Sequence, residues 1–144
     1  MDESKEKSLR QKLSSTRQKL EAVDTDILEA VPFLNRGRRL DVAVFSDEFS
    51  HICPMTGLPD YGELTIDYQP REKIVELKSL KYFLVQYRNV GVFYEHVIFH
   101  ILDALVALLD PLTIRVNYET RPRGGLSSSV SATWPEADAN HSKP

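Results

Sequence analysis

One cysteine and one aspartate lie close enough in the sequence to act together. Cys53 is the only cysteine of the chain, it stands in the segment HICPMTGLPDYG, and Asp60 follows seven residues later. A lone cysteine usually serves as a small apolar side chain. Here Pro54 and Pro59 mark a loop after a strand pattern, so Asp60 lies across a turn from the thiol. A thiolate at this place could attack an electrophilic carbon while a carboxylic acid supplies a proton, but the spacing alone leaves both interpretations open.

Two basic segments could bind a phosphate group. Lys78 and Lys81 lie three residues apart in VELKSLKYF, on one side of an expected helix. Arg123 precedes two glycines in RPRGGLS, where the backbone can approach a ligand closely and the guanidinium offers a planar fork. The alternatives are a solvated helix face and a hairpin turn with basic flanks. None of the glycines forms a GxGxxG pattern, so a nucleotide would not be held in the Rossmann manner.

A carboxylate and three histidines complete the chemical candidates. Glu95 stands at the expected start of a helix, where a negative charge is favoured, and it could instead accept paired N–H donors of a flat heterocycle. His96 and His100 are four residues apart, a spacing compatible with metal ligation, but one cysteine and no acidic cluster accompany them. We therefore favour a structural role for these two and predict no metal site. A mixed zinc site at His51 and Cys53 stays open as an alternative.

The elements that must position these residues follow from the period of the apolar side chains. Alternation predicts strands at 40–49, 62–68 and 113–119, with a weaker strand after residue 125. Three- and four-residue spacing predicts helices at 74–87 and at about 93–109. The order strand, strand, helix, helix, strand, strand predicts an α+β domain in which an antiparallel four-stranded sheet carries both helices on one face.

Composition divides the chain into a polar N-terminal extension at 1–26, a body at 27–133 and a polar tail at 134–144. The extension is interpreted as a solvated helix or a disordered segment. Residues 1–39 carry nine Lys and Arg against seven Asp and Glu, whereas residues 40–144 carry nine against fourteen. The acidic body argues against direct binding of nucleic acid.

Length and charge exclude several classes of protein. A chain of 144 residues is too short for a dinucleotide domain plus a separate catalytic domain, and a single cysteine cannot form an internal disulfide. Its apolar runs are far shorter than a membrane helix requires, and its N-terminus lacks the apolar core of a signal peptide. We therefore expect a cytoplasmic protein without a membrane partner. The two edges of a four-stranded sheet favour assembly with further copies of the chain.

Five short motifs occur in one order along the chain: CPMTGLPD at 53–60, ELKSLKYF at 76–83, YRN at 87–89, Glu95, and PRGG at 122–125. Together they resemble the NADPH-dependent 7-cyano-7-deazaguanine reductases, the nitrile reductases of queuosine biosynthesis. The resemblance runs from about residue 27 to about residue 128 and fits the short, single-module branch of that family. A related branch that forms an amidine lacks the Glu-Leu-Lys-Ser motif, so its presence here favours reduction.

This resemblance implies the tunnelling fold and a covalent mechanism. Cys53 would attack the nitrile carbon of the deazapurine substrate to form a thioimide, with Asp60 as the proton donor. Two molecules of the cofactor NADPH would then deliver hydride in succession. The implied assembly is a homo-oligomer of stacked rings, a decamer, with active sites at the subunit interfaces.

The resemblance also assigns binding residues. The implied substrate-binding residues are Val75, Glu76, Leu77, Tyr94 and Glu95, and the implied cofactor-binding residues are Lys78, Lys81, Arg123 and Gly124. Many family members have a histidine where this chain has Tyr94, which puts any acid–base role of that histidine in doubt here. Two alternatives remain: a zinc-dependent pterin cyclohydrolase relative of the same fold, and a non-catalytic RNA-binding module of tRNA modification.

Overall fold

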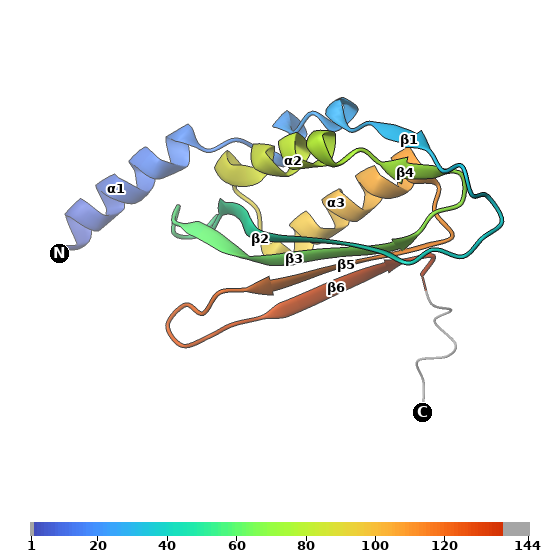
Figure 1. Cartoon of the computed structure of the whole chain (residues 1–144). Coiled ribbons are helices and arrows are strands. Elements are labelled where there is room, and N and C mark those ends of the chain that lie inside the picture. The colour runs from blue at the N-terminus through green and yellow to red at the C-terminus, as the bar shows by residue number, and fades with distance from the viewer. Residues whose placement is uncertain (1, 137–144) are drawn as a thin grey trace.

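Four antiparallel strands form the main sheet, in the spatial order β2-β3-β5-β6. Their bounds are Val42–Ile52 for β2, Pro59–Gln69 for β3, Thr113–Thr120 for β5 and Ser129–Trp134 for β6. The computed structural model describes residues 2–136 of the chain. Helices α2 (Leu77–Val85) and α3 (Tyr94–Leu109) lie over one face of this sheet (Figure 1). The predicted α+β arrangement is confirmed.

The β2–β3 hairpin is longer than the alternation of apolar residues predicts. The register of the pair shifts between Ser46 and Phe49, which is the signature of a β-bulge. Because a bulge breaks the two-residue period, the apolar pattern stops at this point although the strand continues. As a result β2 ends directly before Cys53, and Asp60 lies within β3 rather than in a loop.

The predicted start of the first core helix is wrong by three residues. Ile74 belongs to the short strand β4 (Lys73–Val75), which pairs with β1 (Ala30–Pro32) and brings the 27–34 segment over the body. The helix begins only at Leu77 because Glu76 caps its N-terminus. Ile74 happens to continue the helical spacing, so the pattern alone cannot separate the strand from the helix. A 3-10 turn, η3 (Gln86–Asn89), follows the helix.

The core lies between the helices and the sheet. Its fully buried side chains include Phe83 from α2, Tyr87 from η3, Ile101 and Leu105 from α3, and Val116 from β5. Each of these positions has an apolar or aromatic side chain at the predicted period, so the sheet and the two helices share one continuous apolar layer.

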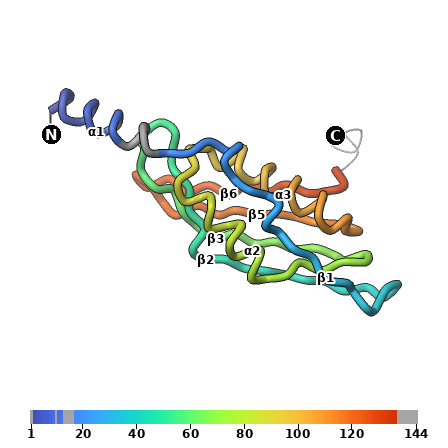
Figure 2. The backbone as a smooth tube through the Cα atoms, turned by 90° about the horizontal axis from the view of Figure 1, so that it is seen from above, coloured from blue at the N-terminus to red at the C-terminus, as the bar shows by residue number. Residues whose placement is uncertain are grey.

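The N-terminal extension is ordered and joins the body earlier than its composition predicts. Helix α1 (Glu3–Thr16) projects away from the sheet (Figures 1 and 2). Two 3-10 turns, η1 (Leu20–Ala22) and η2 (Thr25–Ile27), follow it, and Val23 between them is buried in the core. Of the tail predicted at 134–144, Trp134 ends β6, and residues 137–144 lie outside the described part of the chain.

Candidate active site

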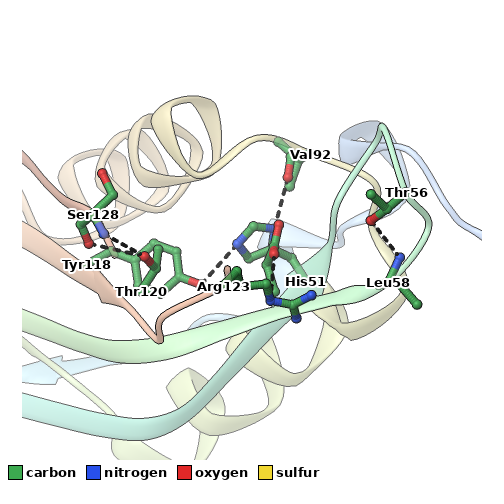
Figure 3. A network of polar contacts seen from close by, with 9 residues as sticks. His51, Thr56, Leu58, Val92, Tyr118, Thr120, Arg123 and Ser128 are labelled. Atoms are coloured by element: carbon green, nitrogen blue, oxygen red, sulfur yellow. Dashed lines mark hydrogen bonds and ion pairs between the residues drawn. The ribbon is translucent and has the colours of Figure 1, made fainter. Parts of the chain in front are cut away.

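The loop that carries Cys53 is held by hydrogen bonds of its own backbone. The Cys53 N–H donates to the Leu58 carbonyl at 2.9 Å, and the Cys53 carbonyl accepts from the Gly57 N–H at 2.9 Å. The Leu58 N–H also reaches the Thr56 hydroxyl at 3.2 Å (Figure 3). The thiol-bearing residue is half-buried. The cysteine is therefore presented on a closed turn with a fixed backbone, and its side chain is reachable from outside.

Asp60 lies across the hairpin from the cysteine, as the sequence predicts. It is paired with His51, two residues before Cys53, and directly opposed residues of antiparallel strands place their side chains on the same face. Its carboxylate is only 18% exposed, and its Oδ1 lies 3.6 Å from the Nε of Arg123. The structure therefore brings a thiol, a carboxylate and a guanidinium to one end of the sheet.

A tight turn between β5 and β6 directs Arg123 toward this carboxylate. The Arg123 N–H donates to the Leu126 carbonyl at 2.7 Å, and the Leu126 N–H donates back at 2.9 Å. The two central residues, Gly124 and Gly125, have φ angles of 56° and 78°, a left-handed conformation that glycine adopts without strain. Ser128 and Thr120 close the base of the loop by hydrogen bonds (Figure 3). The glycine pair thus shapes the arm on which Arg123 sits.

His51 and Tyr118 line the buried side of this site. His51 is fully buried: its Nδ1 lies 2.9 Å from the Val92 carbonyl, and its Nε2 lies 3.1 Å from the Tyr118 hydroxyl (Figure 3). A carbonyl can only accept, so Nδ1 carries the hydrogen and Nε2 accepts from the tyrosine. Burial lowers the pKa of His51, although the nearby Asp60 opposes this. His51 is therefore the neutral centre of a polar network behind Asp60.

The start of α3 lies beside the cysteine loop. The Ile52 N–H donates to the Val90 carbonyl at 2.9 Å, and the Ile52 carbonyl accepts from the Val92 N–H at 3.0 Å. Two residues further on, the Tyr94 ring packs against the Tyr118 ring with centroids 6.5 Å apart. Glu95 is exposed in the first turn of α3, and its carboxylate makes no hydrogen bond or ion pair within residues 2–136. Tyr94 and Glu95 thus join the cysteine end of the molecule.

The remaining predicted residues gather at the start of α2. Val75 is buried, and its N–H donates to the Tyr68 hydroxyl at 3.1 Å. The Glu76 carboxylate accepts from the N–H groups of Lys78 at 2.9 Å and Ser79 at 2.7 Å. These two hydrogen bonds lower the pKa of Glu76. In a single chain this carboxylate caps its own helix by hydrogen bonds to the backbone.

The two lysines of α2 line different hollows of one chain. Lys81 lines a groove of about 300 Å³ between α2 and β2, together with the exposed Leu77 and with Arg88. Lys78 lines a different hollow, on the side of Glu76 and Tyr82. The phosphate site predicted from their three-residue spacing stays a prediction.

Strand length separates the α2 residues from the cysteine. The eleven residues of β3 span about 35 Å from Asp60's end to the turn that leads into β4. The nine residues of α2 return only about 14 Å of that distance. In both views the β2–β3 turn lies at one end of the body, and α2 begins away from that turn and runs back toward it (Figures 1 and 2). One chain thus presents two separate groups of predicted site residues.

Two histidines stand apart from both groups. His96 is exposed on α3, and the Nδ1 of His100 lies 2.5 Å from the Tyr87 hydroxyl. Within residues 2–136, no group of three His, Cys, Asp or Glu side chains is placed to hold a metal ion. No helix of this part is both long and apolar enough to cross a membrane.

Known proteins resemble this chain in sequence. The family model described as "QueF-like protein" matches residues 59–139. The NADPH-dependent 7-cyano-7-deazaguanine reductase of Caldicellulosiruptor bescii is 49% identical over 114 residues, which cover 79% of this chain and 87% of that protein. The protein of the same name from Chlorobium chlorochromatii is 44% identical over 109 residues, covering 76% and 94%. The chain belongs to the QueF-like family.

A solved structure supports the fold of this QueF-like chain. The crystal structure of the archaeosine synthase QueF-Like in the apo form matches with a TM-score of 0.61, covering 69% of this chain and 96% of that one. At 18% identity the match speaks for the fold alone. The tunnelling fold and the family, both inferred from five short motifs, are confirmed.

Sequence reasoning missed two contacts of the QueF-like site. The His51–Tyr118 pair could have been suspected, because His51 shares strand parity with Cys53 and Tyr118 lies on the apolar face of a predicted strand. The second contact comes from Arg17 in the extension, whose Nη1 donates to the Pro54 carbonyl at 2.8 Å. No periodicity or motif marks Arg17, so nothing in the sequence alone could have assigned it.

Proposed function

We propose that this chain reduces the nitrile of 7-cyano-7-deazaguanine to 7-aminomethyl-7-deazaguanine with NADPH, a step of queuosine biosynthesis. The observation that carries this proposal is Cys53 at the end of β2 with Asp60 across the hairpin, in a chain 49% identical to a reductase of that name. A nitrile carbon is an electrophile, and a thiol beside a proton donor is the chemistry needed to activate it.

The first step joins Cys53 to the substrate. Its sulfur attacks the nitrile carbon, one π bond of the C≡N group breaks, and a thioimide forms. The proton that leaves the Cys53 thiol passes to the Asp60 carboxylate and from there to the nitrogen, so the thioimide group stays neutral. A thioimide accepts hydride more readily than a nitrile does. Two hydrides and two protons in all convert the nitrile to a primary amine and release the thiol.

The other residues at the cysteine end bind the base or hold the reacting groups in position. Arg123 holds the Asp60 carboxylate by an ion pair at 3.6 Å, and Glu95 offers an unpaired carboxylate to the N–H edge of the pyrimidine ring. Tyr94 stands where many relatives have a histidine. Its ring packs against the ring of the buried Tyr118, and we assign it to positioning the base.

NADPH supplies the hydride when it is bound, and the residues assigned to it fit its phosphates in chemistry. Lys78, Lys81 and Arg123 are cations with exposed or half-exposed side chains, and Gly124 has open space where a side chain would stand. Lysine and arginine are the usual partners of phosphate. Because Arg123 and the two lysines belong to different groups in one chain, they meet only if a second copy contributes one group.

We therefore assign the working site to the interface between copies of the chain, in a homo-oligomer of stacked rings with ten subunits. The uncovered edges of β2 and β6 support such growth of the sheet, and Leu77 and Phe45 are large apolar side chains exposed beside the α2 groove. The substrate is a free base rather than a nucleic acid, and the enzyme acts in the cytoplasm.

Intact mass spectrometry tests the proposal directly. Mixing the protein with 7-cyano-7-deazaguanine, without NADPH, is expected to add the full mass of the base to the chain. Cys53→Ala is expected to show no adduct and no oxidation of NADPH, whereas the wild type oxidises two NADPH per base. An adduct or turnover in Cys53→Ala contradicts the covalent mechanism. No adduct in a folded wild type, with stoichiometric zinc on elemental analysis, supports the cyclohydrolase alternative instead.

A further inference from the structure

We propose that Arg17, in the N-terminal extension, is a positioning residue for the nucleophile. Its Nη1 donates to the carbonyl of Pro54, the residue that follows Cys53, at 2.8 Å. This contact joins positions 37 residues apart in the chain. The inference rests on the proposed function, because it concerns the reactivity of Cys53.

The backbone around Arg17 is held in place independently of its side chain. The Gln18 N–H donates to the Asn89 carbonyl at 2.6 Å, and the Gln18 carbonyl accepts from the Gly91 N–H at 2.9 Å. The same 89–92 segment is bonded on its other side to Ile52, directly before the cysteine. Three chain segments thus form a small ribbon beside the active-site loop, and Arg17 reaches from its outer segment to the loop.

Arg17 bonds the Pro54 carbonyl, which the backbone hydrogen bonds of Cys53 do not involve. The Cys53 N–H and C=O are bonded to Leu58 and Gly57, which close the turn on itself. These bonds do not fix the turn to the body. Arg17 does so from outside, since it ties the Pro54 carbonyl to the ribbon at 89–92. Without this tie the turn can pivot about the end of β2 and carry the sulfur away from Asp60.

The fold leaves space at Gly91 for the side chain of Arg17. A Cβ atom at this position would lie 2.7 Å from the Arg17 Cδ and 3.2 Å from its Nε. The φ angle of Gly91 is not in the left-handed region, so the backbone itself tolerates alanine there. The absence of a side chain at residue 91 therefore leaves room for the Arg17 side chain. Gly91→Ala displaces that side chain without changing Arg17 itself.

Hydrogen exchange tests the positioning role without any reference to activity. In Arg17→Ala, the amide protons of the 53–58 turn are expected to exchange faster by about tenfold, the change that loss of one hydrogen bond can produce. Lys19→Ala removes an exposed cation two residues away and serves as the matched control. Equal protection of the turn in Arg17→Ala and wild type overturns the proposal.

Two reactions of Cys53 then separate positioning from general damage. Arg17→Ala is expected to slow formation of the nitrile adduct by about tenfold and to leave alkylation by iodoacetamide as fast or faster, because the thiol is displaced rather than covered. Arg17→Lys, which keeps a donor, is expected to recover part of the adduct rate. If both reactions slow together with a lowered melting temperature, Arg17 is merely structural and the proposal fails.

Gly91→Ala completes the experiment as a double-mutant cycle. Alone it is expected to slow adduct formation as Arg17→Ala does, and in the Arg17→Ala background it is expected to add nothing, since the clash has gone. Additive effects contradict the proposal. If the wild type forms no adduct at all, the proposed reductase function fails, while the hydrogen-exchange comparison still decides whether Arg17 holds the turn.

Discussion

The two groups of site residues differ in how completely one chain builds them. At the cysteine end, Cys53, Asp60 and Arg123 come together from three strand ends, and the backbone on both sides of the cysteine is hydrogen-bonded. At the start of α2, Lys78 and Lys81 line different hollows, and Glu76 is occupied as a helix cap. The proposed reacting groups are thus brought together within one chain, whereas the α2 residues are not joined to them there, which is why the proposed function places them against a second copy.

This difference has a physical reason. A nucleophile must be held to within a fraction of an ångström of its partner, which a hairpin with a fixed register provides. Binding a large cofactor needs area rather than precision at one atom. In the proposed assembly, an interface between copies supplies the area that a chain of 144 residues does not offer by itself.

The largest expected effect on turnover is that of replacing Asp60 at the cysteine end. Asp60→Asn removes the proton donor and its pairing with Arg123, so turnover is expected to fall by about 10²- to 10⁴-fold. Asp67→Asn, on the same strand but far from the turn, is the matched control and is expected to stay within about twofold of wild type. Steady-state oxidation of NADPH measures both variants. Comparable losses in the two would mean that general strand damage, rather than proton donation, explains the result.

Mixing inactive variants tests whether the α2 residues serve a neighbour's cysteine. Cys53→Ala and the double variant Lys78→Ala/Lys81→Ala, unfolded together and reassembled, are expected to recover up to about a quarter of wild-type activity. That fraction is the chance that an intact cysteine meets an intact α2 at random. Cys53→Ala mixed with Asp60→Asn is expected to recover nothing, because both residues belong to one hairpin. If activity recovered in the second mixture but not in the first, Cys53 and Asp60 would act from different chains, and the α2 residues would act with the cysteine of their own chain.

The same contrast explains how far the sequence predicts this molecule. Alternating apolar residues and the prolines at 54 and 59 give the hairpin, and hence the Cys53–Asp60 pair, because local period and turn chemistry determine register. The apolar period predicts a helix at Ile74, whereas this residue lies in a strand that forms by pairing with the distant residue Val31. Contacts such as this depend on chain segments meeting in space, and no local pattern encodes them.

The N-terminal extension is the clearest case of this limit. Its polar composition predicts a solvated helix or a disordered segment, and α1 agrees with the first of these. The interactions that attach the segment to the body include the backbone bonds of Gln18, one side-chain bond of Arg17, two hydrogen bonds between Asp24 and Gln86, and the buried Val23. Backbone bonds carry no side-chain signal, and a single arginine is indistinguishable from other surface cations until the fold places it.

A third prediction concerns the buried side of the cysteine end. The pKa of His51 is lowered in the folded protein by burial, and of the nearby charges Asp60 opposes this shift while Arg123 adds to it. An unfolded histidine takes up a proton near pH 6.5, so below that pH the unfolded chain binds more protons than the folded one. The stability that this group contributes is therefore complete above about pH 6.5 and is lost as the pH falls toward the folded pKa.

Urea unfolding between pH 5 and 8 measures this effect. The midpoint is expected to fall on acidification in the wild type and to fall less in His51→Gln. His100, whose pKa is also lowered by burial, supplies the remaining slope. Tyr118→Phe, which leaves the His51 Nε2 without its donor, is expected to cost about 1–3 kcal/mol. An unchanged slope in His51→Gln would mean that the histidine is not a neutral buried group.

The smallest expected effect is that of replacing Glu76 at the start of α2. It tests whether the Glu76 carboxylate is available to bind a ligand. The pKa of Glu76 is lowered by the N–H groups of Lys78 and Ser79, so its contribution to stability is present above about pH 4.5 and lost as the pH falls through the folded pKa. Glu76→Gln, measured by thermal unfolding, is therefore expected to lower the melting temperature by at most about a few degrees at pH 7, and by less at pH 4. If the KM for the base stays within about twofold, Glu76 serves α2 alone, and substrate specificity at this end comes from neighbouring groups. If the KM rises more than about tenfold, the carboxylate turns from its own helix to the ligand in the assembled enzyme, and the α2 end is reorganised when a second copy docks against it.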